Sequence, residues 1–151
     1  MLFEWDYGVQ FEYTTPYTPE QNGVFEQLNR VLITIARAML LDARLPLTFW
    51  GDAVTIASYF RNRTPIGLGG ITPEEAYSGK KPYVGHLYTY GCLAYVYMVK
   101  EQWDHKLEPI AICAYLIGYI PTSRQYQLYD PVWEQIVISM APIFVEGKRL
   151  D

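Results

Sequence analysis

The sequence has few cysteines and no excess of basic residues. Cys92 and Cys113 are the only cysteines among 151 residues, and they do not form a Cys-x-x-Cys pair. A disulfide framework or a zinc site with ordinary ligand spacing is therefore not indicated. Both cysteines lie in apolar runs, so we expect two buried free thiols. The formal net charge of −4 excludes a dominant positive field, and binding to nucleic acid would need a local basic patch.

Long apolar runs and targeting segments are also missing. The longest apolar run, roughly Ile110 to Ile120, is shorter than the about 20 residues that cross a bilayer. The first residues show no basic stretch followed by an apolar one, which a signal peptide requires. We therefore expect an intracellular protein of the nucleus or cytoplasm that is not secreted and has no membrane partner.

What the chain has is apolar and aromatic material. Half of its residues are hydrophobic and 16% are aromatic, with 14 tyrosines. This composition is typical of a folded chain, and tyrosine favours half-buried sheet surfaces and interfaces. The length fits one domain of ordinary size or two small modules.

Charge is distributed unevenly along the chain. The first 21 residues hold four acidic residues and no lysine or arginine, whereas residues 22–63 hold five arginines and three acidic residues. This central stretch is the net-basic part of the chain, and arginine is the better bidentate partner for phosphate. The alternative interpretation is a set of solvated helix faces.

Three helices are predicted, over residues 22–41, 47–63 and 72–79. In the first, apolar residues recur at helical spacing, while Glu26, Arg30 and Arg37 share its other face. Pro46 opens the second helix. Thr72 predicts a capping box for the third. The apolar face of the second helix is expected to contain Phe49, Trp50, Ala53, Ile56, Ala57 and Phe60.

The period changes after His86, where short runs rich in Tyr, Ile and Val alternate with turn residues. This pattern predicts a small antiparallel barrel or sandwich of about five strands, and an α+β protein. The runs are Leu93 to Val99, Ala111 to Ile120, Arg124 to Tyr129 and Gln135 to Ser139.

Several motifs in order carry a family resemblance. They are Thr18-Pro-Glu-Gln-Asn-Gly-Val-Phe-Glu26-Gln-Leu-Asn-Arg30, Leu45-Pro-Leu-Thr-Phe-Trp50, Thr72-Pro-Glu-Glu-Ala-Tyr-Ser-Gly-Lys-Lys-Pro82 and Tyr126-Gln-Leu-Tyr-Asp-Pro131. The chain resembles the C-terminal part of the integrase catalytic core and the following SH3-like domain of copia-type LTR retrotransposon Pol polyproteins. The resemblance implies a truncated RNase H-like core over residues 1–82, consisting of its terminal loop, its catalytic-Glu helix and the following helices. An SH3-like β-barrel is implied over residues 83–148.

The resemblance also implies roles for single residues. Glu26 corresponds to the third acid of the Asp-Asp-Glu triad, which holds two Mg²⁺ or Mn²⁺ ions in the intact family enzyme. Arg30 matches a basic position that faces DNA, and Arg37 and Asn22 are expected to contribute to the same nucleic-acid contact. For Glu26 and Arg30 the alternative is a simple ion pair one helical turn apart.

The chain departs from the family pattern in its acids. Asp6 is the only Asp before Glu26, and it lies too close in sequence to stand for the second acid. One carboxylate cannot hold two metal ions, so we expect this chain alone not to be an enzyme and to need no metal cofactor.

The function implied is a fragment of a retrotransposon integrase, with DNA integration by two-metal strand transfer as its ancestral role and no activity alone. The alternative is a nucleic-acid or protein binding module that uses the SH3-like barrel and the Arg30/Arg37 helix face. Its partners would be DNA, other polyprotein copies or integrase subunits. The tyrosine-rich strands either stack on bases or form the core of the barrel. A pseudogene product without function is the third possibility.

Overall fold

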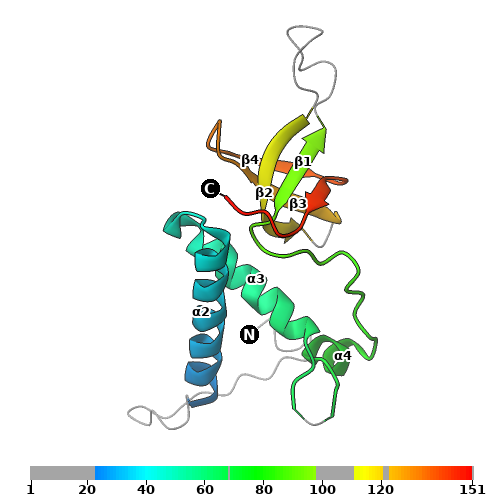
Figure 1. The fold of residues 1–151 in the computed structure, drawn as a ribbon. Coiled ribbons are helices and arrows are strands. Elements are labelled where there is room, and N and C mark those ends of the chain that lie inside the picture. The colour runs from blue at the N-terminus through cyan, green and yellow to red at the C-terminus, as the bar shows by residue number, and fades with distance from the viewer. Residues whose placement is uncertain (1–22, 68, 98–110, 121–122, 151) are drawn as a thin grey trace, which may run out of the picture. The chain divides into compact units, whose positions relative to one another are not determined.

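The computed structural model describes residues 23–67, 69–97, 111–120 and 123–150, and the boundary between two compact units of the chain falls between Val31 and Leu32. Helices come first in the described part, and strands follow (Figure 1). In chain order the elements are α2 (Gly23–Ala43), η2 (Leu47–Phe49), α3 (Trp50–Arg63), α4 (Pro73–Ser78), β1 (Leu93–Tyr97), β2 (Ala111–Ile120), β3 (Gln125–Asp130), β4 (Gln135–Ser139) and β5 (Ile143–Val145).

The first predicted helix is α2, and only its second half contributes buried side chains. Ala36, Leu40 and Ala43 are buried at helical spacing. Val24 is one of the apolar residues that recur at helical spacing in this segment, yet it is exposed, as is the neighbouring Phe25. The apolar stripe therefore predicted the helix correctly but not which of its turns are buried.

The second predicted helix begins later than expected. Pro46 precedes the short 3₁₀ turn η2, and the α-helix α3 starts only at Trp50. Phe49 packs on Tyr129 with ring centroids 4.7 Å apart, whereas Trp50 is exposed. The prediction that Trp50 shares the apolar face with Phe49 was therefore wrong, because consecutive residues of a helical turn are rotated by about 100–120° and Phe49 is the one that packs on the sheet.

Helix α4 has the predicted start and end. The backbone N–H of Glu75 donates to the Thr72 hydroxyl at 3.1 Å, which satisfies one of the free donors of the first turn. Gly79 ends the helix in the left-handed conformation, with φ of 70°.

The five strands form one antiparallel sheet in the order β4-β3-β2-β1-β5, with an irregularity in the β2–β3 register between Leu116 and Gly118. Ser139 ends one edge strand and Ile143 begins the other. Four residue steps reach at most about 14 Å, whereas the outer strands of a flat five-stranded sheet lie about 19 Å apart. The sheet is therefore rolled, as an SH3-like domain requires. No ladder joins β4 to β5 in the described ranges, so the expected five-stranded antiparallel barrel is observed as a rolled sheet that is open between these two strands.

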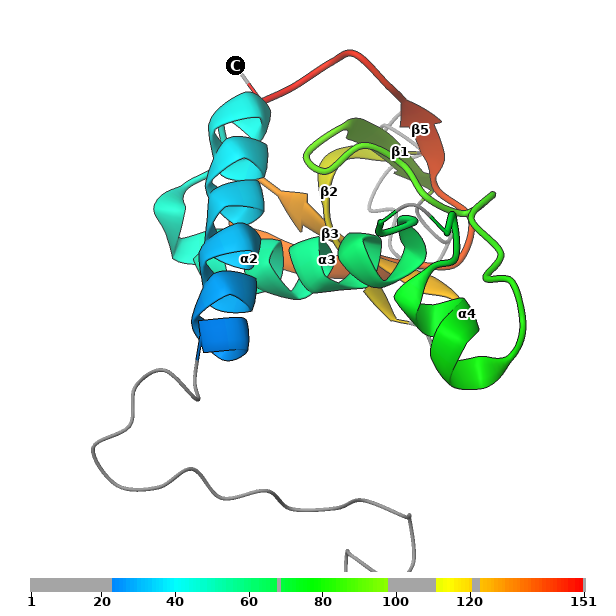
Figure 2. The ribbon, with the colours of Figure 1, turned by 90° about the horizontal axis from the view of Figure 1, so that it is seen from below.

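Strand β2 contributes to two apolar clusters on opposite faces of the sheet. Leu116 belongs to the cluster inside the rolled sheet, together with Leu128 and Val96. Ile117 belongs to the cluster that the second half of α2 and α3 complete, together with Leu40. Successive side chains of a strand point to opposite faces, so one strand supports both clusters. Figure 2 shows α3 running across the sheet.

The two cysteines differ in burial. Cys92 is a buried free thiol as expected, and burial raises its pKa to about 11, which makes it a poor nucleophile. Cys113 is exposed, so the prediction for it was wrong. It pairs in register with Tyr95, whose side chain is also exposed. An apolar run does not show which of its alternating positions face water.

Within the described ranges, none of the helices combines the length and the apolarity that crossing a bilayer requires.

Candidate functional site

A cleft of about 550 Å³ lies where α3, α4, the α4–β1 connection, the end of β2 and the start of β3 meet. Five of its nine lining residues carry aromatic rings, and we call it the aromatic cleft. Its lining residues are Tyr59, Arg63, Glu74, Tyr83, His86, Tyr119, Arg124, Gln125 and Tyr126.

Arg63 forms part of the wall of the aromatic cleft. Its guanidinium carbon lies 3.5 Å from the centroid of the Tyr59 ring, within the range of a cation–π contact. Its Nη2 donates to Glu74 Oε1 at 3.0 Å and lies 2.8 Å from Oε2. The carboxylate therefore neutralises Arg63, which has a structural role and is not a free cation.

A neutral pair links α3 to the α4–β1 connection. The Tyr59 hydroxyl and His86 Nε2 are 2.7 Å apart. Burial raises the pKa of Tyr59, and the carboxylate of Glu74 raises it further while Arg63 opposes the shift. Burial lowers the pKa of His86, and the Arg63 cation lowers it further. Both shifts favour the uncharged forms, so the hydrogen bond joins a neutral phenol to a neutral imidazole at pH 7.

We expect the NMR titration midpoint of His86 to lie below 6.5, its ordinary value. Between the lower folded value and 6.5 the unfolded chain binds more protons, so the contribution of His86 to stability is complete above pH 6.5 and falls as the pH drops below it. The imidazole signal is assigned with His86→Gln. Arg63→Gln should move the midpoint upward, because it removes a cation that lowers the pKa of His86. A wild-type midpoint at or above 6.5 would contradict the burial of His86 beside Arg63.

Tyr119 fixes the connection that carries His86. Its hydroxyl donates to the Tyr88 carbonyl oxygen at 2.8 Å and accepts from the Tyr88 backbone N–H at 2.9 Å. Burial raises the pKa of Tyr119. Its ring stacks on that of Tyr59 with centroids 5.3 Å apart. The Tyr126 hydroxyl donates to the His86 carbonyl oxygen at 3.3 Å, so the connection is attached to both β2 and β3.

Tyr83 contributes the exposed ring of the aromatic cleft. It stacks on His86 with centroids 5.8 Å apart and 24° between the ring planes. The ring lies over Gly85, where a side chain would overlap it. Tyr83 nevertheless remains 76% exposed. Gly85 thus allows a large ring to be held against the wall while most of its surface stays accessible.

Arg124 is the exposed cation of the aromatic cleft. It stands in the β2–β3 turn with φ of 53°, a conformation that non-glycine residues seldom adopt. No ion pair involves it among the described residues. The neighbouring Gln125 accepts a hydrogen bond from the Ser123 hydroxyl at 2.7 Å through its amide oxygen. Its amide nitrogen has no hydrogen bond within the described ranges.

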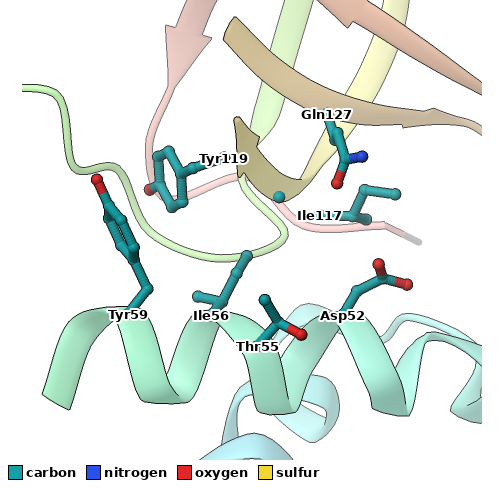
Figure 3. A pocket seen from close by; sticks show the side chains of 8 residues that line it. Asp52, Thr55, Ile56, Tyr59, Ile117, Tyr119 and Gln127 are labelled. Atoms are coloured by element: carbon teal, nitrogen blue, oxygen red, sulfur yellow. The ribbon is translucent and has the colours of Figure 1, made fainter. Parts of the chain in front are cut away.

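A smaller hollow of about 110 Å³ adjoins the aromatic cleft and shares Tyr59 and Tyr119 with it (Figure 3). Asp52 from α3 and Gln127 from β3 line it, and its floor includes Ile56. It is smaller than the about 300–1,000 Å³ of ordinary ligand pockets, so we assign it no ligand.

The residues predicted from the sequence do not line the aromatic cleft. Glu26, Arg30 and Arg37 are exposed on α2, and Asn22 lies outside the described residues. Nothing in their placement tests the predicted roles, which stay predictions. Sequence reasoning noted the tyrosine-rich strands as possible base-stacking surfaces but did not identify the cleft, because its lining comes from segments up to 67 residues apart, from Tyr59 to Tyr126.

The described residues do not fit a two-metal site. No three His, Cys, Asp or Glu side chains come together in the part of the chain that the structure describes. Two-metal catalysis requires several oxygen ligands.

The rolled antiparallel sheet that follows the helices is consistent with an SH3-like domain, and the family model of the retroviral polymerase SH3-like domain matches residues 92–151. Over 94% of its length the chain is 38% identical to the retrovirus-related Pol polyprotein from transposon TNT 1-94 of Nicotiana tabacum. Two Arabidopsis thaliana Pol polyproteins, from transposons RE2 and RE1, are 30% and 29% identical over 80% and 81% of the chain. The chain is thus homologous to a region of copia-type retrotransposon Pol polyproteins.

The chain spans only 9–11% of the length of these curated relatives. No solved structure matches it. The matched family model is that of the SH3-like domain, which is not a catalytic domain.

Proposed function

We propose that this chain is a part of a retrotransposon integrase region that binds nucleic acid and does not catalyse strand transfer on its own. The aromatic cleft carries the proposal, since the exposed ring face of Tyr83 and the unneutralised Arg124 supply the two features that single-stranded nucleic acid recognition combines. The similarity to retrotransposon Pol polyproteins supports the proposal, because this resemblance implies an ancestral role in DNA integration, and integration requires contact with nucleic acid.

Helix α2 supplies a second surface for the same function. Arg30 and Arg37 lie seven residues apart, which places them on one face of the helix, and both are exposed. Arginine binds phosphate bidentately and would position the protein on a backbone without reading sequence. This surface would act alongside the aromatic cleft.

The proposal extends to the origin of the helices. We assign α2, α3 and α4 to the terminal helices of an RNase H-like integrase core and Glu26 to its third acid. The position of Glu26 in the first turn of α2, after the Pro- and Gly-containing segment, supports this assignment. Mg²⁺ or Mn²⁺ would bind only where further carboxylates join Glu26.

Fluorescence anisotropy tests the binding. We expect the chain to bind labelled single- and double-stranded DNA at low salt, with an affinity that falls as salt rises. Arg124→Gly and Arg37→Ala should each reduce the slope of log K against log salt by about 0.7–0.9 for each phosphate that the variant no longer neutralises. Lys148→Ala removes an exposed positive charge outside the aromatic cleft and is the matched control.

Two results would contradict the proposal. Absence of salt-dependent binding to any DNA would remove the binding function. Joining of a donor end by the purified chain with Mg²⁺ or Mn²⁺ would show that it catalyses strand transfer alone.

A further inference from the structure

The aromatic cleft has the features of a site for a single unpaired nucleotide. We infer that it takes one nucleotide of a single strand, with the base on the free face of Tyr83 and the phosphate at Arg124. This inference rests on the proposed function, since it names the form of nucleic acid that the cleft recognises.

The stacking surface is built before any ligand arrives. Tyr83 stacks on His86, and His86 is held at its Nε2 by Tyr59 and at its carbonyl oxygen by Tyr126. The α4–β1 connection is also fixed by the two hydrogen bonds between Tyr119 and Tyr88. Because the inner rings are already ordered, a base that stacks on Tyr83 meets a surface whose ordering costs little further entropy.

Charge within the aromatic cleft favours one phosphate. Glu74 neutralises Arg63, and the pair of Tyr59 and His86 carries no charge at pH 7. Arg124 is therefore the cation of the cleft that is available to an anionic ligand. A proline-rich peptide, which aromatic grooves also bind, would bring no anion to match it.

Gln125 adds a means to contact the edge of a base. Its amide oxygen is engaged by Ser123, which leaves the amide NH₂ group as the donor. That group can donate to the carbonyl oxygens and ring nitrogens of a base. Duplex DNA pairs these edges, whereas a single strand leaves them accessible.

Size and stacking favour an unpaired base over a base pair within a helix. The aromatic cleft of about 550 Å³ lies in the range of small-ligand pockets. Each base inside a duplex has both faces covered by its neighbours, so stacking on Tyr83 would first require the cost of unstacking. An unpaired base offers its face without that cost.

The test compares a fluorescein-labelled oligothymidine of about 12 nucleotides with a blunt duplex of equal length, by anisotropy on the full chain. Tyr83→Ala should weaken single-strand binding about 5- to 150-fold, and Tyr83→Phe should restore it. Tyr97→Ala, which removes another largely exposed tyrosine (62%) outside the cleft, should leave the affinity unchanged. Arg124→Gly is suited to a position with positive φ and should reduce the salt slope for the single strand by about 0.7.

The outcomes separate this inference from the proposed function. If the chain binds neither DNA, both are overturned. If it binds duplex as tightly as single strand, or if Tyr83→Ala leaves single-strand affinity intact, only the inference is overturned. Binding of a proline-rich peptide that is lost in Tyr83→Ala, while binding of the oligothymidine is retained, would reassign the cleft to peptides.

Discussion

Replacing Gly91 with alanine is expected to lower the free energy of unfolding by about 2–5 kcal/mol. Gly91 has φ of 72°, which costs an L-residue about 1–2 kcal/mol. A methyl group there would also overlap the Ala43 side chain and approach the Ala43 Cα to 3.0 Å. Ala43 is fully buried at the end of α2, so relief requires movement of backbone, and such overpacking costs about 1–3 kcal/mol.

Gly147→Ala is the matched control for Gly91→Ala. Gly147 has φ of 90°, and no atom lies within 4 Å of the place where its side chain would stand. It should therefore show only the conformational cost of about 1–2 kcal/mol. Urea unfolding followed by circular dichroism measures both variants. Equal losses of unfolding free energy in the two variants would show that the close contact between Gly91 and Ala43 adds nothing to the cost of Gly91→Ala.

Truncation of a buried side chain on either face of β2 is expected to destabilise both the rolled sheet and the helices packed on it. Leu116 and Ile117 are both fully buried, and replacing either with alanine should cost about 2–5 kcal/mol. Because they belong to separate clusters on one strand, each variant should lower the midpoint of a single unfolding transition.

Cys113→Ala is the control on the same strand, since Cys113 is exposed and its loss should change stability by no more than about 0.5 kcal/mol. Chemical denaturation followed by tryptophan fluorescence and by circular dichroism would reveal the transitions. Two separate transitions in Ile117→Ala would mean that the helix-covered cluster unfolds independently of the rolled sheet.

Local chemistry made much of the fold predictable. The Thr72 cap and the left-handed Gly79 define α4 as the sequence indicates. The bounds of β2 and β4 agree with the predicted runs, because turn residues separate them. The 3₁₀ turn at Leu47–Phe49 was missed, since a proline before a helix does not show whether the first turn is α or 3₁₀.

The site was predictable only in its composition. Tyrosine-rich strands indicated a stacking surface, but the hydrogen bond of Tyr59 with His86 joins residues 27 positions apart. The bonds of Tyr119 with Tyr88 span 31 positions. Such convergence depends on how the α4–β1 connection returns to the sheet, and no local pattern in the chain encodes it.

The sharing of β2 between two clusters has a consequence for how this region can be divided. The SH3-like match begins at residue 92, yet Ile117 and Tyr129 are covered by side chains from α2, η2 and α3. A cut at residue 92 would give water access to that face and leave an apolar patch prone to aggregation. The segment that the family model matches is therefore shorter than the segment that must stay together to keep this apolar face covered, because the latter also includes α2, η2 and α3.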